Sequence, residues 1–335
     1  MFSKCITHNK TDPTFKHYVL YRNTLNRLKR KSRHVYYNEL FHALRNDMKK
    51  TWQTINGMIG KLNDKSNASH IFKQDDIIIS DPSDISNGFC EYFTNVGCSL
   101  ARKIPKSNFT ALHYVNNTMQ NPHSLFMSPT DKNEIRDIIG SLKPKYSAGH
   151  DKINTILLKQ LNTALSLPIS MLVNLSISTG IVPDELKIAK IVPIHKSKSR
   201  EEFSNYRPIS LLTSVSKVLE RVVHKRLYAF LEQHLILNNK QYGFRKKHST
   251  VDAVIKYISD ISLSQDLKKS TLAVYLDLSK AFDTLNHTIL LSKMEHYGIR
   301  GMPLLWFKNY LTNRKHFVEY QKQSSILQNS ECGVP

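Results

Sequence analysis

A single acidic residue, Asp277, stands at the end of a short apolar run, Leu272 to Leu276, within the stretch TLAVYLDLSKAFDTLNH. The run predicts a β-strand that delivers the Asp277 carboxylate at its C-terminal end. Phe282 and Asp283 follow in a helical or turn segment. A carboxylate in this position can hold a divalent cation, and a bulky ring five residues later can test the shape of a bound substrate. The same residues also fit a buried strand that ends in a helix-capping aspartate, and the strand by itself favours that simpler structure.

The composition indicates a basic protein with a polyanionic partner. The chain has 335 residues, enough for one large or two modest domains, and 40% of them are apolar, which can support hydrophobic cores. Lysine and arginine number 48 against 27 aspartate and glutamate, so the formal net charge is +21. Nucleic acid is the commonest partner of such a charge excess. An anionic membrane surface is the rival, but no apolar run approaches the length that spans a bilayer.

The cysteines and the N-terminus indicate an intracellular protein. The N-terminal MFSKCITHNK lacks the apolar stretch of a secretory signal. Cys5, Cys90, Cys98 and Cys332 form no CxxC pair and no cluster with zinc-ligand spacing. We therefore expect reduced thiols in a nuclear or cytoplasmic protein that is not secreted.

Residues 1–65 are predicted to be a basic helical linker. Between Lys16 and Lys50 there are ten lysines and arginines and two acids, a balance of 10 − 2 = +8. The densest part of this region contains Lys29, Arg30, Lys31 and Arg33, and tyrosines are interleaved with the charge. This mixture suits phosphate contacts combined with base or ribose stacking, and we expect these four cations to bind nucleic acid. A solvated helix whose aromatic residues pack on a neighbour fits the same pattern.

Residues 66–127 are rich in Asn, Ser, Asp and Pro and are predicted to be an irregular connecting region. It contains one expected strand, Ile77 to Ile79, and a helical patch around Ile85 to Leu100.

A more regular domain is expected over residues 128–335. Ser128-Pro129-Thr130-Asp131 offers an N-cap, a first-turn proline and an acid before a helical apolar pattern. Two further helices are expected over 154–164 and 169–179, broken at Pro168 and ended by a C-cap at Gly180. A strand over 188–194 and an amphipathic helix over 216–237 follow. The fold class is therefore predicted to be α+β.

Seven short stretches of this domain occur in a specific order. They are SAGHDKI (147–153), IVPIHKSKS (191–199), NYRPISLL (205–212), QYGFRKKHST (241–250), LDLSKAFDTLNH (276–287), YGIRG (297–301) and CGVP (332–335). The ordered set closely resembles the reverse transcriptase of non-LTR (LINE-type) retrotransposons, most like the jockey group. The resemblance covers roughly residues 128–335. A group II intron maturase is a more distant resemblance, because the wording of the first and third stretches is nearer the retrotransposon pattern.

The resemblance implies a right-hand polymerase, with a basic helical N-terminal region followed by the fingers and part of the palm. Such an enzyme is an RNA-directed DNA polymerase that joins dNTPs to a DNA primer on an RNA template, using two Mg²⁺ ions. Asp277 matches the first metal-binding aspartate, and the backbone carbonyl of Leu278 would be a further ligand. Phe282 matches the steric gate that excludes a ribose 2′-hydroxyl. Asp283 is expected to be structural, and His287 is expected to cap or brace the turn.

The resemblance also assigns cations to the nucleotide and the template. Arg207, in NYRPISLL, matches the fingers residue near the triphosphate, where a guanidinium can grip phosphate oxygens; pairing with a palm carboxylate is the structural alternative. Lys196 and Lys198 could help from the preceding loop. Arg245, Lys246 and Lys247 are expected to line the template path or the nucleotide entry, with plain surface charge as the alternative.

One departure from the family pattern bears on activity. The family continues CGVP with Gln and Gly and later has a Tyr-x-Asp-Asp turn that supplies the remaining carboxylates, and no Tyr-x-Asp-Asp sequence occurs in these 335 residues. We therefore expect a 5′-side fragment of a polymerase, from a decayed element or a truncated gene model, that is inactive by itself. The alternative is a non-catalytic, basic RNA-binding relic of such an element.

Overall fold

The computed structural model describes residues 13–45, 47–59, 71–74, 77–102, 113, 120–278, 280–330 and 333–334. The chain folds as two compact units, Met1–Ala68 and Ser69–Pro335. The boundary lies close to residue 65, where we expected the basic linker to end.

The first unit consists of two helices, α2 (Pro13–Leu44) and α3 (Met48–Met58). Asp47 caps α3 by accepting a hydrogen bond from the Lys50 amide at 3.1 Å. The middle of α2, from residue 20 to residue 36, is exposed throughout. The helical prediction for this region is confirmed, and the charged side chains of α2 face solvent.

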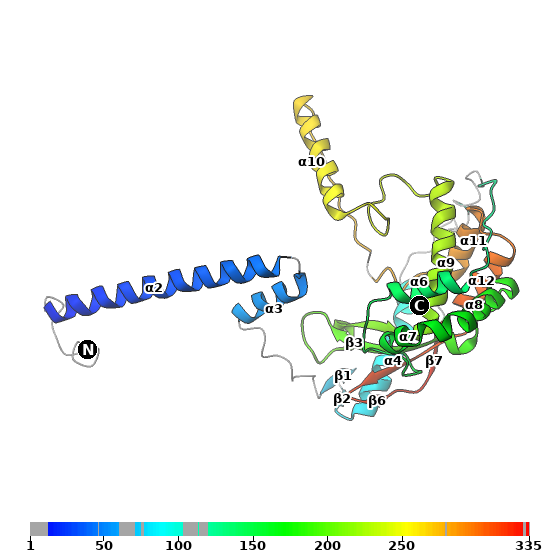
Figure 1. Cartoon of the computed structure of the whole chain (residues 1–335), viewed down its shortest axis with the longest axis horizontal. Helices are drawn as coiled ribbons and strands as arrows, with labels where there is room; N and C mark the ends of the chain where they lie inside the picture. Colours follow the sequence, from blue (N-terminus) through cyan, green and yellow to red (C-terminus); the bar gives the residue numbers. More distant parts are fainter. Residues whose placement is uncertain are drawn as a thin grey trace. The chain divides into compact units, whose positions relative to one another are not determined.

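The second unit is built on a five-stranded sheet of order β4-β3-β5-β6, in which β7 also pairs with β5 (Figure 1). The strands are β3 (Ile188–His195), β4 (Tyr206–Leu211), β5 (Arg314–Tyr320), β6 (Gln323–Ser324) and β7 (Gln328–Ser330). β3 pairs with β4 antiparallel and with β5 parallel. A parallel pair needs a long crossover, and here the crossover places β5 beside β3, more than a hundred residues later in the chain.

One face of this sheet packs on elements that lie far before it in the sequence. These are the hairpin β1 (Phe72–Gln74) and β2 (Ile77–Ile79), and the helix α4 (Pro82–Arg102). Phe72 is fully buried and stacks on Phe203 with ring centroids 4.9 Å apart. Phe89 of α4 meets Tyr206 and Tyr320 edge-on or tilted within 5.5 Å. The strand and helix predicted within 66–127 are therefore present.

We expected residues 66–127 to be irregular, but residues 71–74 and 77–102 contain regular elements. Their aromatic residues, such as Phe72 and Phe89, belong to the core of the second unit. Periodicity showed the elements but could not show their partners, which are distant in sequence.

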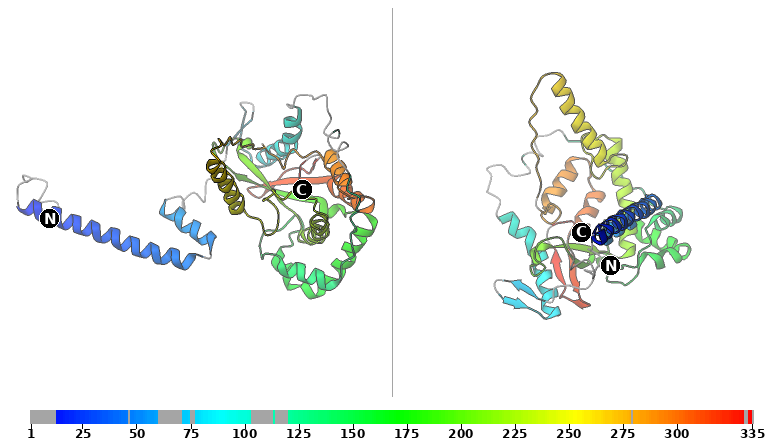
Figure 2. Two further views of the ribbon diagram at one scale, coloured as in Figure 1. Left: turned by 90° about the horizontal axis from the view of Figure 1, so that it is seen from above. Right: turned by 90° about the vertical axis from the view of Figure 1, so that its left-hand side faces the viewer.

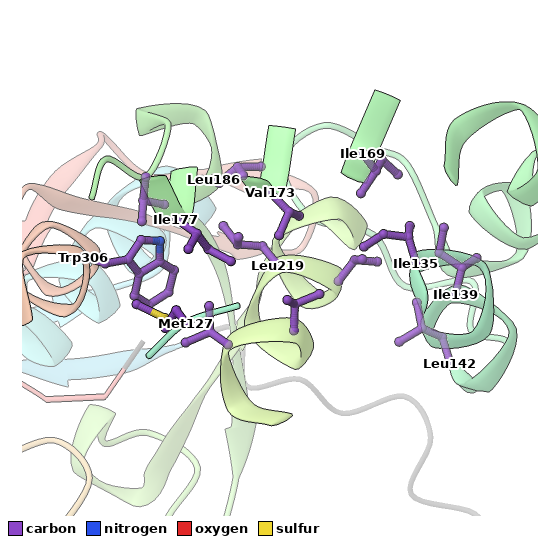
Figure 3. Packing of buried hydrophobic residues seen from close by; sticks show 14 of the residues in the cluster. Met127, Ile135, Ile139, Leu142, Ile169, Val173, Ile177, Leu186, Leu219 and Trp306 are labelled. Carbon is purple, nitrogen blue, oxygen red and sulfur yellow. The ribbon is translucent and has the colours of Figure 1, made fainter. Parts of the chain in front are cut away.

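A group of helices with its own hydrophobic core completes the second unit (Figure 2). The group contains α6 (Lys132–Ser141), α7 (Thr155–Gln160), α8 (Asn162–Thr179), α9 (Ser214–Gln233) and α12 (Met302–Leu311). Its core gathers residues from all of these helices, including Ile135, Val173, Leu219 and Trp306 (Figure 3). Trp306 is 1% exposed and donates its indole N–H to Ser176 Oγ at 2.9 Å, so its one polar atom is satisfied.

Two helix boundaries differ from the predictions and a third agrees. Asp131, rather than Ser128, caps α6, because its carboxylate accepts the Glu134 amide at 2.7 Å. The break expected at Pro168 lies at Leu161, and α8 runs through Pro168. A proline costs a helix one hydrogen bond, but α8 buries Ile169, Val173 and Ile177 just beyond it. Gly180 is the expected C-cap, with φ of +70°.

Residues 272–276, for which we predicted a strand, form no strand. Residues 271–278 are extended but unpaired, and Leu272 and Leu276 are each 90% exposed. An apolar strand is stabilised by pairing and by burial of its side chains, and no described strand pairs with this segment. The predicted strand is therefore wrong for this structure.

The helix before that segment, α10 (Thr250–Asp266, yellow in Figure 1), also contributes no buried residue. Its start is nevertheless well specified, because Ser249 and Asp252 form a reciprocal capping box. No helix among the described residues is both long and apolar enough to cross a bilayer.

Candidate functional site: the gate turn and the fingers strands

The turn that carries Phe282 is held by its own backbone. The amides of Asp283 and Thr284 both donate to the Lys280 carbonyl, at 2.9 and 3.2 Å. The following helix, α11 (His287–His296), begins with Asn286 as its N-cap. We call residues 280–285 the gate turn.

Gly333 and Val334 of the CGVP motif are bonded to the gate turn. The Gly333 amide donates to the Leu285 carbonyl at 3.0 Å, and the Val334 amide donates to the Phe282 carbonyl at 2.7 Å. His287 Nε2 lies 2.8 Å from the Gly333 carbonyl oxygen, which fits its expected bracing role. Gly333 has φ of +88°, and a Cβ there would lie 2.9 Å from the Phe282 carbonyl oxygen. Only glycine fits this position without strain, so two motifs some fifty residues apart depend on each other.

The Phe282 ring points outward from the turn and meets a third motif. It is 61% exposed and lies edge-on to Phe244 of the QYGFRKK loop, with ring centroids 6.1 Å apart.

A cavity of about 400 Å³ lies beside the gate turn. Its lining comes from β3, β4, β5, the gate turn and the CGVP motif, and includes Ile191, Ser210, His316, Phe282 and Gly333. Burial raises the pKa of Asp283 at the rim, and burial lowers the pKa of His316. A cavity of this size falls in the range of small-molecule sites.

Asp277 and Leu278 lie outside this cavity on the exposed segment. Their carboxylate and carbonyl oxygens are the donor type that Mg²⁺ prefers. In the described part of the chain, however, no group of three or more His, Cys, Asp or Glu side chains could hold a metal ion. The described residues therefore fit Mg²⁺ in kind but do not complete a two-ion site.

Arg207, Lys196 and Lys198, which we expected to bind the nucleotide, are exposed on the β3–β4 hairpin. Arg207 pairs in register with Ile194 and shares a face of the hairpin with the exposed Ile209. Lys196 and Lys198 lie on the connecting loop, which is fixed because Asn205 Nδ2 donates to the Ser199 carbonyl at 2.9 Å. None of the three cations lines the cavity, so the structure does not gather them around it.

The three cations of the QYGFRKKHST stretch differ in availability. Arg245 grips Glu232 with two hydrogen bonds, at 3.1 and 2.8 Å, and also bonds the Asn238 carbonyl. Lys246 lies over the Tyr228 ring at 5.4 Å and remains exposed, as does Lys247. The geometry of Arg245 favours a positioning role, and the binding role of all three stays a prediction.

In the first unit, Lys29, Arg30, Lys31 and Arg33 are all exposed along α2, as are Tyr21 and Tyr36.

One contact to the gate turn could not be found from the sequence. Tyr92 of α4 accepts a hydrogen bond from Lys280 Nζ at 2.5 Å, and that ammonium lies 4.6 Å from the ring centroid. Tyr92 precedes the predicted domain start at residue 128, and nothing in its local sequence points to Lys280.

Comparison with known proteins shows which proteins the sequence resembles. Residues 194–335 match the family described as reverse transcriptase (RNA-dependent DNA polymerase). The chain is 35% identical over 219 residues to the probable RNA-directed DNA polymerase from transposon BS of Drosophila melanogaster, which covers 63% of this chain. It is 32% identical over 213 residues to the probable RNA-directed DNA polymerase from transposon X-element of the same organism, and this match covers 62% of the chain. It is 27% identical over 213 residues to the RNA-directed DNA polymerase from mobile element jockey, also of Drosophila melanogaster, and this match covers 63% of the chain.

The chain spans 23% of the length of each of these three relatives. The matched region contains β4, the gate turn and Gly333-Val334, all of which line the same cavity. Residues 194–335 are therefore similar to the reverse transcriptase family, and the chain is similar to the RNA-directed DNA polymerases of the mobile elements BS, X-element and jockey.

Proposed function

We propose that this chain forms the fingers and the start of the palm of a right-hand RNA-directed DNA polymerase. The observation that carries the proposal is the cavity between strands β3, β4 and β5 and the gate turn, which is lined by residues of four family motifs. Its substrates would be dNTPs, a DNA primer and an RNA template, and it would act inside the cell.

Phe282 would select the sugar of the incoming nucleotide. Its ring is exposed beside the cavity, while its backbone is fixed by Val334. A ring held in place can exclude a 2′-hydroxyl by contact alone, since excluding an atom needs position rather than charge. Arg207, Lys196 and Lys198 would bind the triphosphate from the fingers hairpin, where exposed cations can reach phosphate oxygens.

Asp277 would supply one carboxylate, and Leu278 one carbonyl oxygen, toward two Mg²⁺ ions. When bound, such ions activate the primer 3′-hydroxyl and neutralise charge on the phosphate. The remaining carboxylates would have to come from elsewhere, because the described residues hold no metal-binding cluster.

A second function is favoured by the lack of a metal-binding cluster in the described residues. With Asp277 exposed and no acidic cluster in the described residues, the 335 residues by themselves would act as a basic RNA-binding module. The charge of +21 and the exposed cations of α2 support binding without catalysis.

A chimera separates these proposals. The matched residues of the jockey polymerase would be replaced by those of this chain, and primer extension would be measured on poly(A) RNA with an oligo(dT) primer. DNA synthesis that depends on the inserted residues supports the polymerase proposal. A folded chimera that binds RNA but extends no primer, beside an active parent, contradicts it.

A further inference from the structure

The loop between α6 and α7, residues 143–153, has no role in the function proposed above. Tyr146 at its tip is 88% exposed, which is unusual for a large aromatic side chain. Lys143, Lys145 and Lys152 of the same loop are exposed as well.

The loop is held in one conformation at both ends. The buried Thr155 hydroxyl lies 2.9 Å from the Lys143 carbonyl oxygen and accepts the Lys145 amide at 2.9 Å. Ser214 Oγ donates to the Ile153 carbonyl at 2.8 Å. The Gly149 backbone packs so closely that a Cβ there would lie 2.8 Å from the Thr213 nitrogen. A ligand that binds this loop therefore loses little of its binding energy to ordering the backbone.

The start of α9 adds to the positive charge around the loop. Arg221 donates to Ser141 Oγ at 3.0 Å, next to the point where the loop leaves α6. Burial lowers the pKa of Lys217, and the nearby Lys145 lowers it further. With Lys143, Lys145 and Lys152, these two residues make five cations against the acids Asp151, Glu185 and Glu220, a balance of 5 − 3 = +2. Glu185 is 3.3 Å from His150, Asp151 accepts the Ile153 amide, and Glu220 accepts the Tyr310 hydroxyl, so all three acids are engaged.

We propose that these residues form a binding site for single-stranded nucleic acid. Tyr146 stacks on an unpaired base, and the surrounding cations contact the flanking phosphates. We call Lys143, Lys145, Tyr146, Lys152, Lys217 and Arg221 the loop patch. A single strand is the ligand that matches, because a flat ring can stack only on a base that is not already stacked in a duplex.

The loop patch is separate from the fingers cations assigned to the nucleotide. It adjoins Leu212 and Thr213, which directly follow β4. Arg207 lies five residues before Leu212 along that strand, about 17 Å away. The assignment of the bound strand as a template rests on the proposed polymerase function, whereas the binding itself does not.

The test measures binding without synthesis, using the full chain. Lys29, Arg30, Lys31 and Arg33 are changed to Gln in every protein, so that α2 contributes less. Fluorescence anisotropy follows a labelled 12-nucleotide RNA and the DNA of the same sequence, and inorganic polyphosphate serves as a competitor that has charge but no bases.

Tyr146→Ala should weaken oligonucleotide binding about fivefold, the low end of base-stacking effects, and should leave polyphosphate competition unchanged. Tyr146→Phe should bind like the parent, because the ring is kept. Phe126→Ala removes another exposed aromatic residue of the second unit and should have no effect. A preference for RNA or for DNA identifies the strand, and either supports the site.

Changing Lys143, Lys145 and Lys152 together to Gln should reduce the slope of log binding constant against log salt concentration by about 2, because each lost phosphate contact contributes about 0.7. The matched control changes the exposed Lys132, Lys308 and Lys322 to Gln and should leave the slope unchanged. The site is refuted if Tyr146→Ala binds RNA as tightly as the parent, or weakens polyphosphate equally. It is also refuted if the control triple flattens the slope as much as the loop triple.

Discussion

Glu134 joins α6 to α9, and the substitution Glu134→Gln should lower stability in a pH-dependent way. Its carboxylate receives both guanidinium nitrogens of Arg226 at 2.6 Å, Lys225 Nζ at 2.8 Å and the Thr130 hydroxyl at 2.7 Å. Hydrogen bonds, above all those from Arg226, lower the pKa of Glu134 to about 2. Lys225 and Thr130 lower this pKa further, whereas burial raises it.

The size of the effect follows from that pKa. A fall from 4.5 to about 2 corresponds to about 3 kcal/mol, at about 1.4 kcal/mol for each tenfold change in proton affinity. Lys225 is largely exposed, so solvent screens part of this, and about 2 kcal/mol is the expected contribution. The folded-state pKa is depressed. The stabilisation is therefore fully present above the unfolded pKa near 4.3 and is lost as pH falls through 2.

The assay is thermal unfolding of the parent and Glu134→Gln between pH 7 and pH 2. At pH 7 the variant should melt several degrees lower, since about 1 kcal/mol shifts a domain of this size by roughly 2–4 °C. The difference should shrink below pH 4 and vanish near pH 2. The exposed pair Lys256 and Asp260 provides a control, and Asp260→Asn should leave the melting temperature unchanged. A melting difference that persists unchanged at pH 2 would refute the reasoning.

Four further outcomes are expected. The 335 residues by themselves should not extend a primer in Mg²⁺ or Mn²⁺, because no metal-binding cluster exists in the described residues; extension above a buffer control would contradict this. Deleting residues 1–60 should flatten the salt dependence of RNA binding by about 0.7 for each lost phosphate contact, and equal slopes with and without them would exclude an N-terminal site. Gly333→Ala should destabilise the gate turn by about 1–2 kcal/mol or more, seen as faster proteolysis near Phe282, whereas Gly140→Ala, with open space around it, should not. In the active chimera, Phe282→Ala should admit ribonucleotides while deoxynucleotide incorporation survives; unchanged sugar discrimination in a folded variant would assign the ring to packing.

Local patterns predicted much of the fold correctly. The apolar stripe of α9, the strand β3 and the glycine cap of α8 all depend on residues close in sequence. The ordered motifs identified the family, because their combined order is far more specific than any one of them.

Features set by distant partners could not be predicted. The burial of Phe72 and Phe89 depends on Phe203, Tyr206 and Tyr320, more than a hundred residues away. The contact of Tyr92 with Lys280 depends on the same packing. The strand expected at Leu272–Leu276 failed for the converse reason, since its sequence is strand-like but no described strand pairs with it.

The side chain of Arg245 shows a further limit. Its motif suggested a free cation, whereas Glu232, thirteen residues earlier near the end of α9, accepts hydrogen bonds from Nε and Nη2 of its guanidinium, and the Asn238 carbonyl accepts one from Nη1. Sequence places both residues but does not show which arginine donors a neighbouring carboxylate already occupies.

The polymerase proposal depends above all on Asp277, which it assigns as a metal-binding carboxylate. The most direct measurement is Mg²⁺-dependent primer extension on RNA by the chimera carrying Asp277→Ala, with Asp283→Asn as the matched control at the gate turn. Extension should be abolished by Asp277→Ala at an unchanged melting temperature and RNA affinity, and it should survive Asp283→Asn. Extension retained by Asp277→Ala, or lost only in proportion to unfolded protein, would contradict the claim.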